Sequence, residues 1–311
     1  MNLKIVYMGT PDFSVKPLDE LNKKYDVIAV VTQPDKKIGR KQEVRYSKVK
    51  EYALENNIKV LQPKNIREEY KQIIDLNPDI IITCAYGQII PKVLLDYPRY
   101  KCINIHASLL PKYRGGAPIH RCIINGEKYT GITIMYMSPK MDEGDILYQE
   151  KVDISLDDNV GTLHDKLSEL GSKMIISFLP KLINNNFKRI KQDNNEATYA
   201  YNISREDEKI DFNKNTIDIY NQIRGLSPWP SAYAYLDDKI IKIFNSEIGK
   251  SNKEGKIGEI INIYDNGIGI KTIDGEIIFT EIQIEGKKRC NVKNFLNGIH
   301  DKNELLKKIV K

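Results

Sequence analysis

Asn104 and His106 are separated by one apolar residue at the end of a short apolar run that begins at Cys102. Side chains alternate along a strand, so both polar groups emerge on the same face and can converge. An amide can donate a hydrogen bond to a developing oxyanion, and an imidazole can polarise a carbonyl group or carry a proton. The pair is therefore a candidate site, and the structural alternative is a turn-forming asparagine beside a hydrogen-bonded histidine.

A long irregular loop follows this pair over residues 108–118. It contains Pro111, Pro118 and the pair Gly115-Gly116, and it is too long for a tight turn. Glycine permits backbone angles that other residues resist, so such a loop can bring N–H and C=O groups close to a flat ligand. A plain surface crossover would have the same composition.

Carboxylates occur between the next two predicted strands, in the segment 141–145 with Asp142, Glu143 and Asp145. In an open α/β sheet, ligands bind in the crevice beyond the carboxyl ends of the strands, and this segment is expected near the same crevice as Asn104. The alternative for Asp142 is a turn residue that bonds its own backbone.

The first half of the chain alternates apolar strand-like runs with helical patterns, which predicts a doubly wound α/β domain with a mostly parallel sheet. The expected strands are residues 3–8, 27–31, 80–83, 102–105, 132–137 and 146–151. The expected helices lie near residues 16–21, 48–55 and 160–179.

The helical period breaks after Pro180, and an Asn-rich stretch follows. We expect domains at residues 1–183 and 206–311, joined by a linker at 184–205. Short strands at 259–264, 269–273 and 277–284, separated by Asp/Asn-Gly turns, predict a small β-barrel or sandwich in the second domain.

The composition is that of a globular protein, with 41% hydrophobic and 29% charged residues among 311. The amino terminus lacks the pattern of a signal peptide, and no apolar stretch is long enough to span a membrane, so we expect a cytoplasmic protein without a membrane partner. We also expect a monomer. The four cysteines are scattered and there are only four histidines, which argues against a metal site.

Basic residues are concentrated in three segments, 36–50, 188–191 and 287–289, within a net charge of +6. Clusters of this kind suit an extended polyanion, although a solvated surface would have the same pattern.

The segment from Asn104 to Gly144 resembles the signature of the folate-dependent formyltransferases. The following residues carry the resemblance and keep the order and spacing of the family: Asn104, His106, Ser108, Leu109, Leu110, Pro111, Arg114, Gly115, Asp142 and Gly144. The resemblance implies a Rossmann-like first domain and 10-formyltetrahydrofolate as co-substrate, with no metal. It also implies Asn104, His106 and Asp142 as catalytic residues, in which Asn104 donates to the oxyanion and Asp142 orients His106 and accepts a proton.

The same resemblance implies two folate-contacting loops. Their residues are Ser108, Leu109, Leu110 and Pro111, and Tyr86, Gly87, Gln88 and Ile89.

Other segments resemble those members of the family that formylate methionyl initiator tRNA. They are residues 8–13, 33–35, 39–40 and 227–230. In these members the second domain is an open, OB-like β-barrel, which would bind tRNA here. By resemblance, the tRNA acceptor end is bound by Lys36, Lys37, Arg40 and Lys41.

Several other functions are compatible with parts of this pattern. A nicotinamide site is disfavoured because the first turn lacks the GxGxxG motif and Pro11 removes an N–H donor. A formyltransferase for an amino sugar or a small ribonucleotide amine, and a hydrolase that releases formate, would share the catalytic trio. A nonenzymatic RNA-binding protein would use the barrel and the basic segments.

Overall fold

The computed structural model describes residues 3–38, 42–251 and 253–311. The contacts within the chain divide it into two compact units. The first unit comprises Met1–Pro118, Thr130–Asp153 and His164–Ala200, and the second comprises Ile119–Tyr129, Ile154–Leu163 and Tyr201–Lys311. Residues 184–200, which the sequence analysis assigns to a linker, lie in the first unit.

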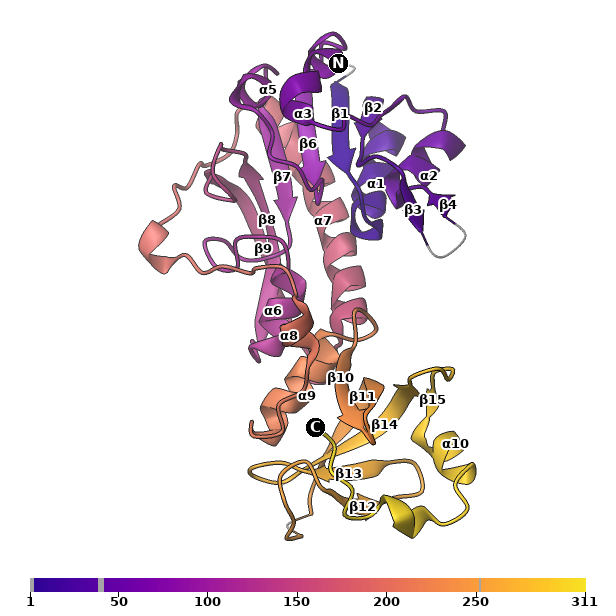
Figure 1. Ribbon diagram of the computed structural model, residues 1–311. Coiled ribbons are helices and arrows are strands. Elements are labelled where there is room, and N and C mark those ends of the chain that lie inside the picture. Colours follow the sequence, from indigo (N-terminus) through magenta and orange to yellow (C-terminus); the bar gives the residue numbers. More distant parts are fainter. Residues whose placement is uncertain (1–2, 39–41, 252) are drawn as a thin grey trace. The chain divides into compact units, whose positions relative to one another are not determined.

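A seven-stranded sheet forms the centre of the first unit, in the order β5-β2-β1-β6-β7-β8-β9 (Figure 1). Its strands are β1 (Lys4–Gly9), β2 (Asp26–Val31), β5 (Val60–Leu61), β6 (Ile80–Cys84), β7 (Cys102–His106), β8 (Tyr129–Tyr136) and β9 (Ile146–Asp153). The strands from β5 to β7 pair in parallel, whereas β8 is antiparallel to β7. Every residue of β6 is buried, as expected for a central strand with both faces covered. The predicted α/β class and the Rossmann-like sheet are confirmed.

Helices lie between the strands of this sheet along the chain, and their buried residues recur at helical spacing. They are η1 (Asp12–Ser14), α1 (Val15–Lys24), α2 (Lys48–Glu55), α3 (Ile66–Glu69), α4 (Lys71–Ile74), α5 (Lys92–Asp96), α7 (Val160–Ile183) and η2 (Asn194–Glu196). Helix α1 buries Leu18 and Leu21, which are one turn apart. Helix α2 begins after Ser47, whose side chain accepts a hydrogen bond from the backbone N–H of Lys50.

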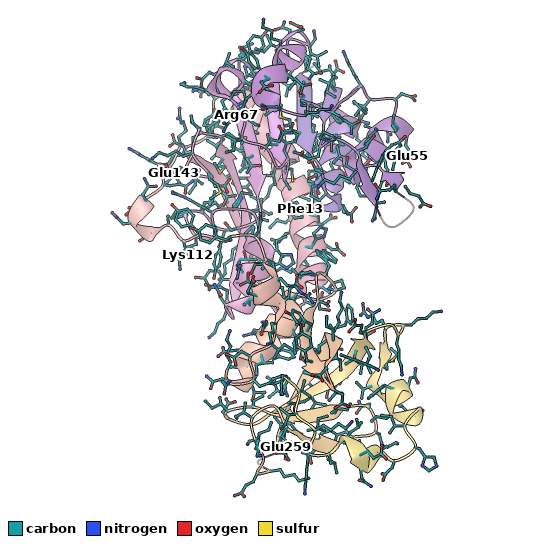
Figure 2. The ribbon with its side chains drawn as sticks, viewed as in Figure 1. Phe13, Glu55, Arg67, Lys112, Glu143 and Glu259 are labelled. Atoms are coloured by element: carbon teal, nitrogen blue, oxygen red, sulfur yellow. The ribbon has the colours of Figure 1, made fainter. Side chains whose placement is uncertain are left out.

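Helix α7 continues past the point at which the sequence predicts its end. The helix contains Pro180 and ends at Ile183, four residues beyond the expected end at Leu179. Proline lacks a backbone N–H donor, but near the end of the helix this loss leaves the residues after Pro180 helical. Earlier in the helix, the Ser168 hydroxyl donates a hydrogen bond of 2.9 Å to the carbonyl of Phe13, which Figure 2 labels.

The basic segment after residue 35 contains a small two-stranded sheet that the sequence analysis does not predict. Strand β3 (Lys36–Ile38) pairs antiparallel with β4 (Glu43–Arg45). Polar side chains predominate in both strands, so the apolar alternation that reveals a strand is missing.

The second unit contains a six-stranded sheet in the order β10-β11-β14-β13-β12, with β15 paired to β14. Its strands are β10 (Ala232–Leu236), β11 (Lys239–Gly249), β12 (Ile260–Ile263), β13 (Ile268–Lys271), β14 (Glu276–Ile284) and β15 (Cys290–Asn291). All of these pairs are antiparallel, which confirms an antiparallel β domain after the α/β domain. The remaining helices are α6 (Pro118–Ile124), α8 (Arg205–Glu208), α9 (Thr216–Gly225), α10 (Val292–Asn297) and η3 (Lys302–Leu305).

Helix α9 and the inner face of this sheet form one apolar core. Ile219 and Ile223 of α9 are buried together with Ile243 of β11 and Phe279 of β14. Across the described part of the chain, no helix is long and apolar enough to cross a membrane.

Candidate active site

Asn104 lies in β7, where it pairs in register with Thr83 of the neighbouring strand β6. The Thr83 hydroxyl donates a hydrogen bond of 2.8 Å to Asn104 Oδ1. Because the acceptor end of the amide is occupied in this way, the Nδ2 group is the end that remains to donate. Asn104 is half-buried, so a ligand can reach it, and within the described residues no acceptor contacts Nδ2.

His106 ends β7 and is almost completely buried, with 6% of its surface exposed. Its Nε2 lies 3.0 Å from the carbonyl oxygen of Tyr113. Since a carbonyl oxygen only accepts, Nε2 carries the proton and Nδ1 faces the other direction. The orientation of the ring is thus held by the backbone of the loop after β7.

Asp142 comes from the loop between β8 and β9, and its Oδ2 lies 3.7 Å from His106 Nδ1. This separation is longer than the roughly 3.2 Å of a direct N–H···O hydrogen bond, so the two groups are neighbours without a shared proton. The same Oδ2 accepts a hydrogen bond of 2.9 Å from the backbone N–H of Gly115. The structure therefore brings His106 and Asp142 together, and it joins the two loops in which Figure 2 labels Lys112 and Glu143.

Two glycines of this region are required by the backbone. Gly115 has φ +118°, and a Cβ there would lie 2.8 Å from the carbonyl oxygen of Ala200. At Gly144 a Cβ would lie 1.7 Å from the carbonyl oxygen of Tyr136. Any larger residue would push the loops that carry Asp142 and its partner N–H out of place.

The loop after His106 is held by side chains that the sequence analysis does not identify. The Thr133 hydroxyl donates to the carbonyl of Ser108 at 2.6 Å and accepts from the N–H of Leu110 at 3.2 Å. Gln149 Nε2 donates to the carbonyl of Leu110 at 2.8 Å. Ser108 and Leu110 are buried, whereas Leu109 and Pro111 are half-buried, so only part of this expected folate loop is accessible.

The other expected folate loop, residues 86–89, follows β6. Tyr86 is 4% exposed and packs into the core, so its side chain serves as an anchor for the loop. Its carbonyl accepts from Thr10 Oγ1 at 2.9 Å and from Gln33 Nε2 at 3.0 Å. Gly87 and Ile89 are exposed, and they are the members of this loop that a ligand can reach most easily.

The structure describes only some of the residues that are expected to bind tRNA. Lys36 and Lys37 are exposed on β3. Arg40 and Lys41 lie outside the described residues. At the base of this hairpin, Lys50 Nζ contacts Asp35 Oδ2 at 2.6 Å and Gln62 Oε1 at 2.8 Å.

Cysteine chemistry does not contribute to this site. Cys84 ends β6 close to Asn104, but burial raises the pKa of its thiol to about 12. Burial likewise raises the pKa of Cys102. Both thiols therefore stay protonated and unreactive near neutral pH.

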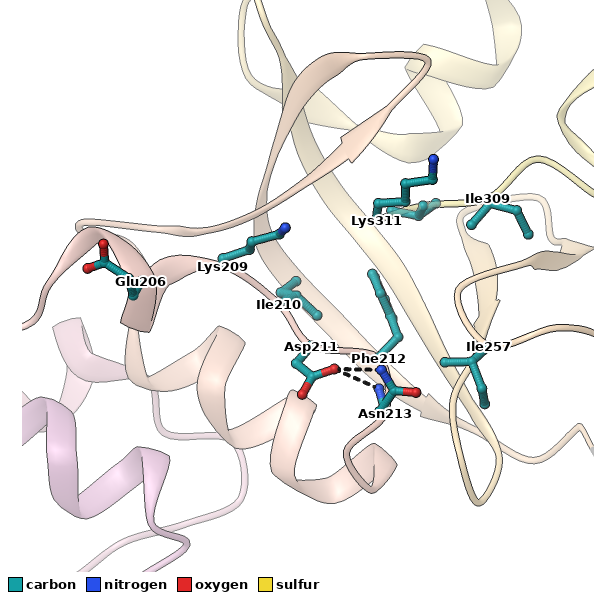
Figure 3. A pocket seen from close by; sticks show the side chains of 10 residues that line it. Glu206, Lys209, Ile210, Asp211, Phe212, Asn213, Ile257, Ile309 and Lys311 are labelled. Atoms are coloured by element: carbon teal, nitrogen blue, oxygen red, sulfur yellow. Dashed lines mark hydrogen bonds between the residues drawn. The ribbon is translucent and has the colours of Figure 1, made fainter.

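In residues 3–38, 42–251 and 253–311, no group of three or more His, Cys, Asp or Glu side chains could hold a metal ion. A pocket of about 460 Å³ lies in the second unit (Figure 3). Its lining residues are Glu206, Lys209, Ile210, Asp211, Phe212, Asn213, Ile257, Ile309, Val310 and Lys311. It includes none of the residues around Asn104, so it is separate from the site described above.

The sequence of this chain matches two models of known protein families, one for each part of the chain. Residues 1–179 match the formyl transferase family, and residues 202–300 match the formyl transferase C-terminal domain. The chain belongs to the formyl transferase family, and the family resemblance proposed from the sequence is confirmed.

Three curated relatives cover nearly the whole chain, and each is a methionyl-tRNA formyltransferase. The protein from Geobacillus sp. (strain WCH70) is 51% identical over 300 residues, covering 95% of this chain and 94% of the relative. The protein from Malacoplasma penetrans (strain HF-2) is 49% identical, covering 96% and 94%. The protein from Staphylococcus aureus (strain MW2) is 48% identical, covering 95% and 96%.

Solved structures share the same fold. WlaRD, a sugar 3N-formyl transferase determined in the presence of dTDP and 5-N-formyl-THF, is 26% identical with a TM-score of 0.65, covering 93% of this chain and all of that one. HypX from Aquifex aeolicus has a TM-score of 0.67 at 17% identity, with 95% of this chain covered and 49% of that chain. At that identity the likeness concerns the fold alone.

Proposed function

We propose that this protein transfers a formyl group from 10-formyltetrahydrofolate to the α-amino group of methionyl initiator tRNA. The observation that carries the proposal is the roughly 50% identity to methionyl-tRNA formyltransferases over about 95% of the chain. The product is N-formylmethionyl-tRNA, the aminoacyl-tRNA that starts translation. Tetrahydrofolate is the second product, and the reaction needs no metal.

The transfer requires three events at the formyl carbon. The neutral amine attacks this carbon, the carbonyl oxygen becomes an oxyanion, and a proton leaves the attacking nitrogen before the bond to the folate nitrogen breaks. Asn104 donates from Nδ2 to the oxyanion, since its Oδ1 is engaged by Thr83. His106 Nδ1 and Asp142 face each other across 3.7 Å, and this pair takes the proton from the amine and passes it towards the leaving nitrogen.

The two folate-contacting loops position the donor in this proposal. Exposed Gly87 and Ile89 and half-buried Leu109 offer backbone groups and apolar surface to the flat pterin. The basic hairpin around Lys36 and Lys37 binds the acceptor end of the tRNA through its phosphates, together with Arg40 and Lys41. The antiparallel domain adds further tRNA contacts.

A second candidate acceptor is an amino sugar, because WlaRD is a sugar formyltransferase with the same fold. Its identity to this chain is 26%, about half that of the methionyl-tRNA formyltransferases. The sequence therefore favours the tRNA acceptor.

The choice of acceptor is tested by supplying 10-formyltetrahydrofolate with charged initiator tRNA, charged elongator tRNA, free methionine or an amino-sugar nucleotide. We expect kcat/KM to be highest for charged initiator tRNA, with KM rising as salt is added because phosphate contacts release counterions. Arg40→Ala should raise KM for tRNA and flatten its salt dependence, while the affinity for folate stays unchanged. Preference for the amino sugar would move the function to a small acceptor.

Thr83 gives a further test of how Asn104 acts. Thr83→Val keeps the branched shape of the side chain but removes the hydroxyl that fixes the Asn104 amide, so the amide can turn and kcat should fall about tenfold or more. Thr83→Ser restores the hydroxyl and should restore most of the rate. Steady-state kinetics of both variants measures this, and equal kcat values would reject a role of Thr83 in orienting Asn104.

A further inference from the structure

Arg114 lies completely buried behind the loop that carries Asp142, with 0% of its side chain exposed. Its guanidinium donates to Gln192 Oε1 from Nε at 3.1 Å and from Nη2 at 2.8 Å. Nη2 also donates to Asn194 Oδ1 at 2.9 Å. Among the described residues its carboxylate neighbour is Glu143, whose Oε1 lies 3.5 Å from Nη1. A charge buried in this way is costly unless it is paired and hydrogen-bonded, so the groups around it are constrained to present acceptors.

The guanidinium determines which way the amide of Gln192 points. Arginine carries only donors, so the oxygen of Gln192 must face Arg114 and the Nε2 group must face away. On that side, Nε2 donates to the carbonyl of Asp142 at 2.7 Å and to the carbonyl of Gly144 at 2.7 Å. Both donor positions of the amide are therefore used to hold one loop.

The backbone of Asp142 adopts an unusual conformation in this loop. Asp142 has φ +51°, in the left-handed region that few non-glycine residues adopt. Its main chain is held by Gln192, and its carboxylate is held by the N–H of Gly115, the residue after Arg114. Asp142 is thus fixed at both ends from one buried cluster.

The segment that supplies Gln192 is itself tied to the first unit by backbone pairing. Ile190 and Ile146 exchange hydrogen bonds of 2.8 and 2.9 Å. The N–H of Arg114 donates to the carbonyl of Thr198 at 2.9 Å, and the N–H of Ala200 donates to the carbonyl of Arg114 at 2.7 Å. Residue 192 lies between the parts of the chain that match the two family domains, which end at 179 and begin at 202.

We propose that Arg114 and Gln192 are positioning residues for Asp142. Arg114 orients the amide of Gln192, and the amide holds the Asp142 loop so that the carboxylate stays beside His106 Nδ1. The inference rests on the proposed function where it connects this geometry with proton transfer.

Gln192→Glu separates this role from a purely structural one. The new carboxylate forms an ion pair with the buried guanidinium of Arg114, so Arg114 keeps an acceptor and the variant is expected to fold. It has no N–H to donate to Asp142 and Gly144, and it places negative charge against both carbonyls. Because a misplacement of about 1 Å at a reacting group can cost roughly 10²-fold, kcat should fall about 10- to 100-fold with little change in either KM.

Asn194→Ala is the matched control, because it removes another acceptor of Arg114 but leaves both donors of Gln192 in place. We expect its kcat to equal that of the wild type. Gln192→Met keeps the length of the side chain and lacks both donors, so it provides the test if Gln192→Glu does not fold. Amide hydrogen exchange of the peptide that contains Gly115 gives a readout independent of activity, and it should be faster in Gln192→Glu.

Turnover equal to that of the wild type in a folded Gln192 variant, or unchanged exchange at Gly115, would overturn the positioning role. A wild-type protein that transfers no formyl group would contradict the proposed function instead, and the exchange of Gly115 would still decide whether Gln192 holds the loop.

Discussion

Replacing Asn104 with alanine is expected to lower kcat about 10²- to 10³-fold, the usual effect of removing one oxyanion donor. Thr83 donates to Oδ1 of Asn104 and so orients the amide with its Nδ2 group directed away from Thr83, where it can donate to the oxyanion. An interaction made in the transition state alone affects kcat and kcat/KM equally, so KM for the folate donor should stay close to the wild-type value.

Steady-state kinetics measures this effect, with circular dichroism and thermal unfolding as folding controls. Asn184→Ala, which removes an exposed amide from the Asn-rich segment, is the matched control and should retain wild-type turnover. A folded Asn104→Ala protein with normal kcat would remove Asn104 from the catalytic role.

Asp142→Asn is expected to lower turnover by a similar or larger factor, since general acid–base catalysis contributes about 10²- to 10⁴-fold. Asparagine has the same shape, tolerates the left-handed backbone of this position, and can still accept the hydrogen bond from Gly115. It cannot take a proton near neutral pH, so the variant isolates basicity from shape.

The matched control for this variant is Asp145→Asn in the same loop. Asp145 is paired with Arg189 at 2.7 Å and lies outside the contact with His106, so the control should remain active. Folate affinity, measured by titration, should be unchanged in both variants. Retained turnover of Asp142→Asn across neutral pH would exclude Asp142 as the proton acceptor.

The central strands of the first unit could be predicted because apolar residues predominate in them. Residues 80–83 and 102–105 were assigned from such runs, and both lie within observed strands, β6 and β7. Strand β11 escaped prediction because lysine, asparagine and glutamate interrupt its apolar residues, and only part of the strand is buried. The two residues of β5 are too few to form a pattern.

Of the candidate site, the pair Asn104 and His106 could be predicted from the alternation of side chains along a strand. Asn104 and His106 are neighbours in one strand, so alternation alone brings them to one face. The order of the predicted strands places the segment of Asp142 near the same crevice, and the family resemblance adds its pairing with His106. The residues that hold these groups were not predicted, because Thr83 is 21 positions from Asn104 and Gln192 is 50 positions from Asp142. No local period of the sequence reports hydrogen bonds over such separations.

The hydrogen bond that orients His106 could not be predicted from the sequence either. The family resemblance implies that Asp142 orients the ring, whereas in the structure Nε2 donates to the carbonyl of Tyr113. A backbone acceptor has no signature in the sequence, since every residue carries one. The 3.7 Å between His106 Nδ1 and Asp142 Oδ2 leaves the carboxylate available for the proton of the amine.

The most direct test of this account is a single-turnover reaction with the protein in excess over charged initiator tRNA and with a donor labelled in its formyl group. We expect the label on the α-amino group of the methionine esterified to the tRNA, and no transfer by Asn104→Ala over the same period. Label released as free formate, transfer to another amine in preference to the tRNA, or equal transfer by Asn104→Ala would contradict it.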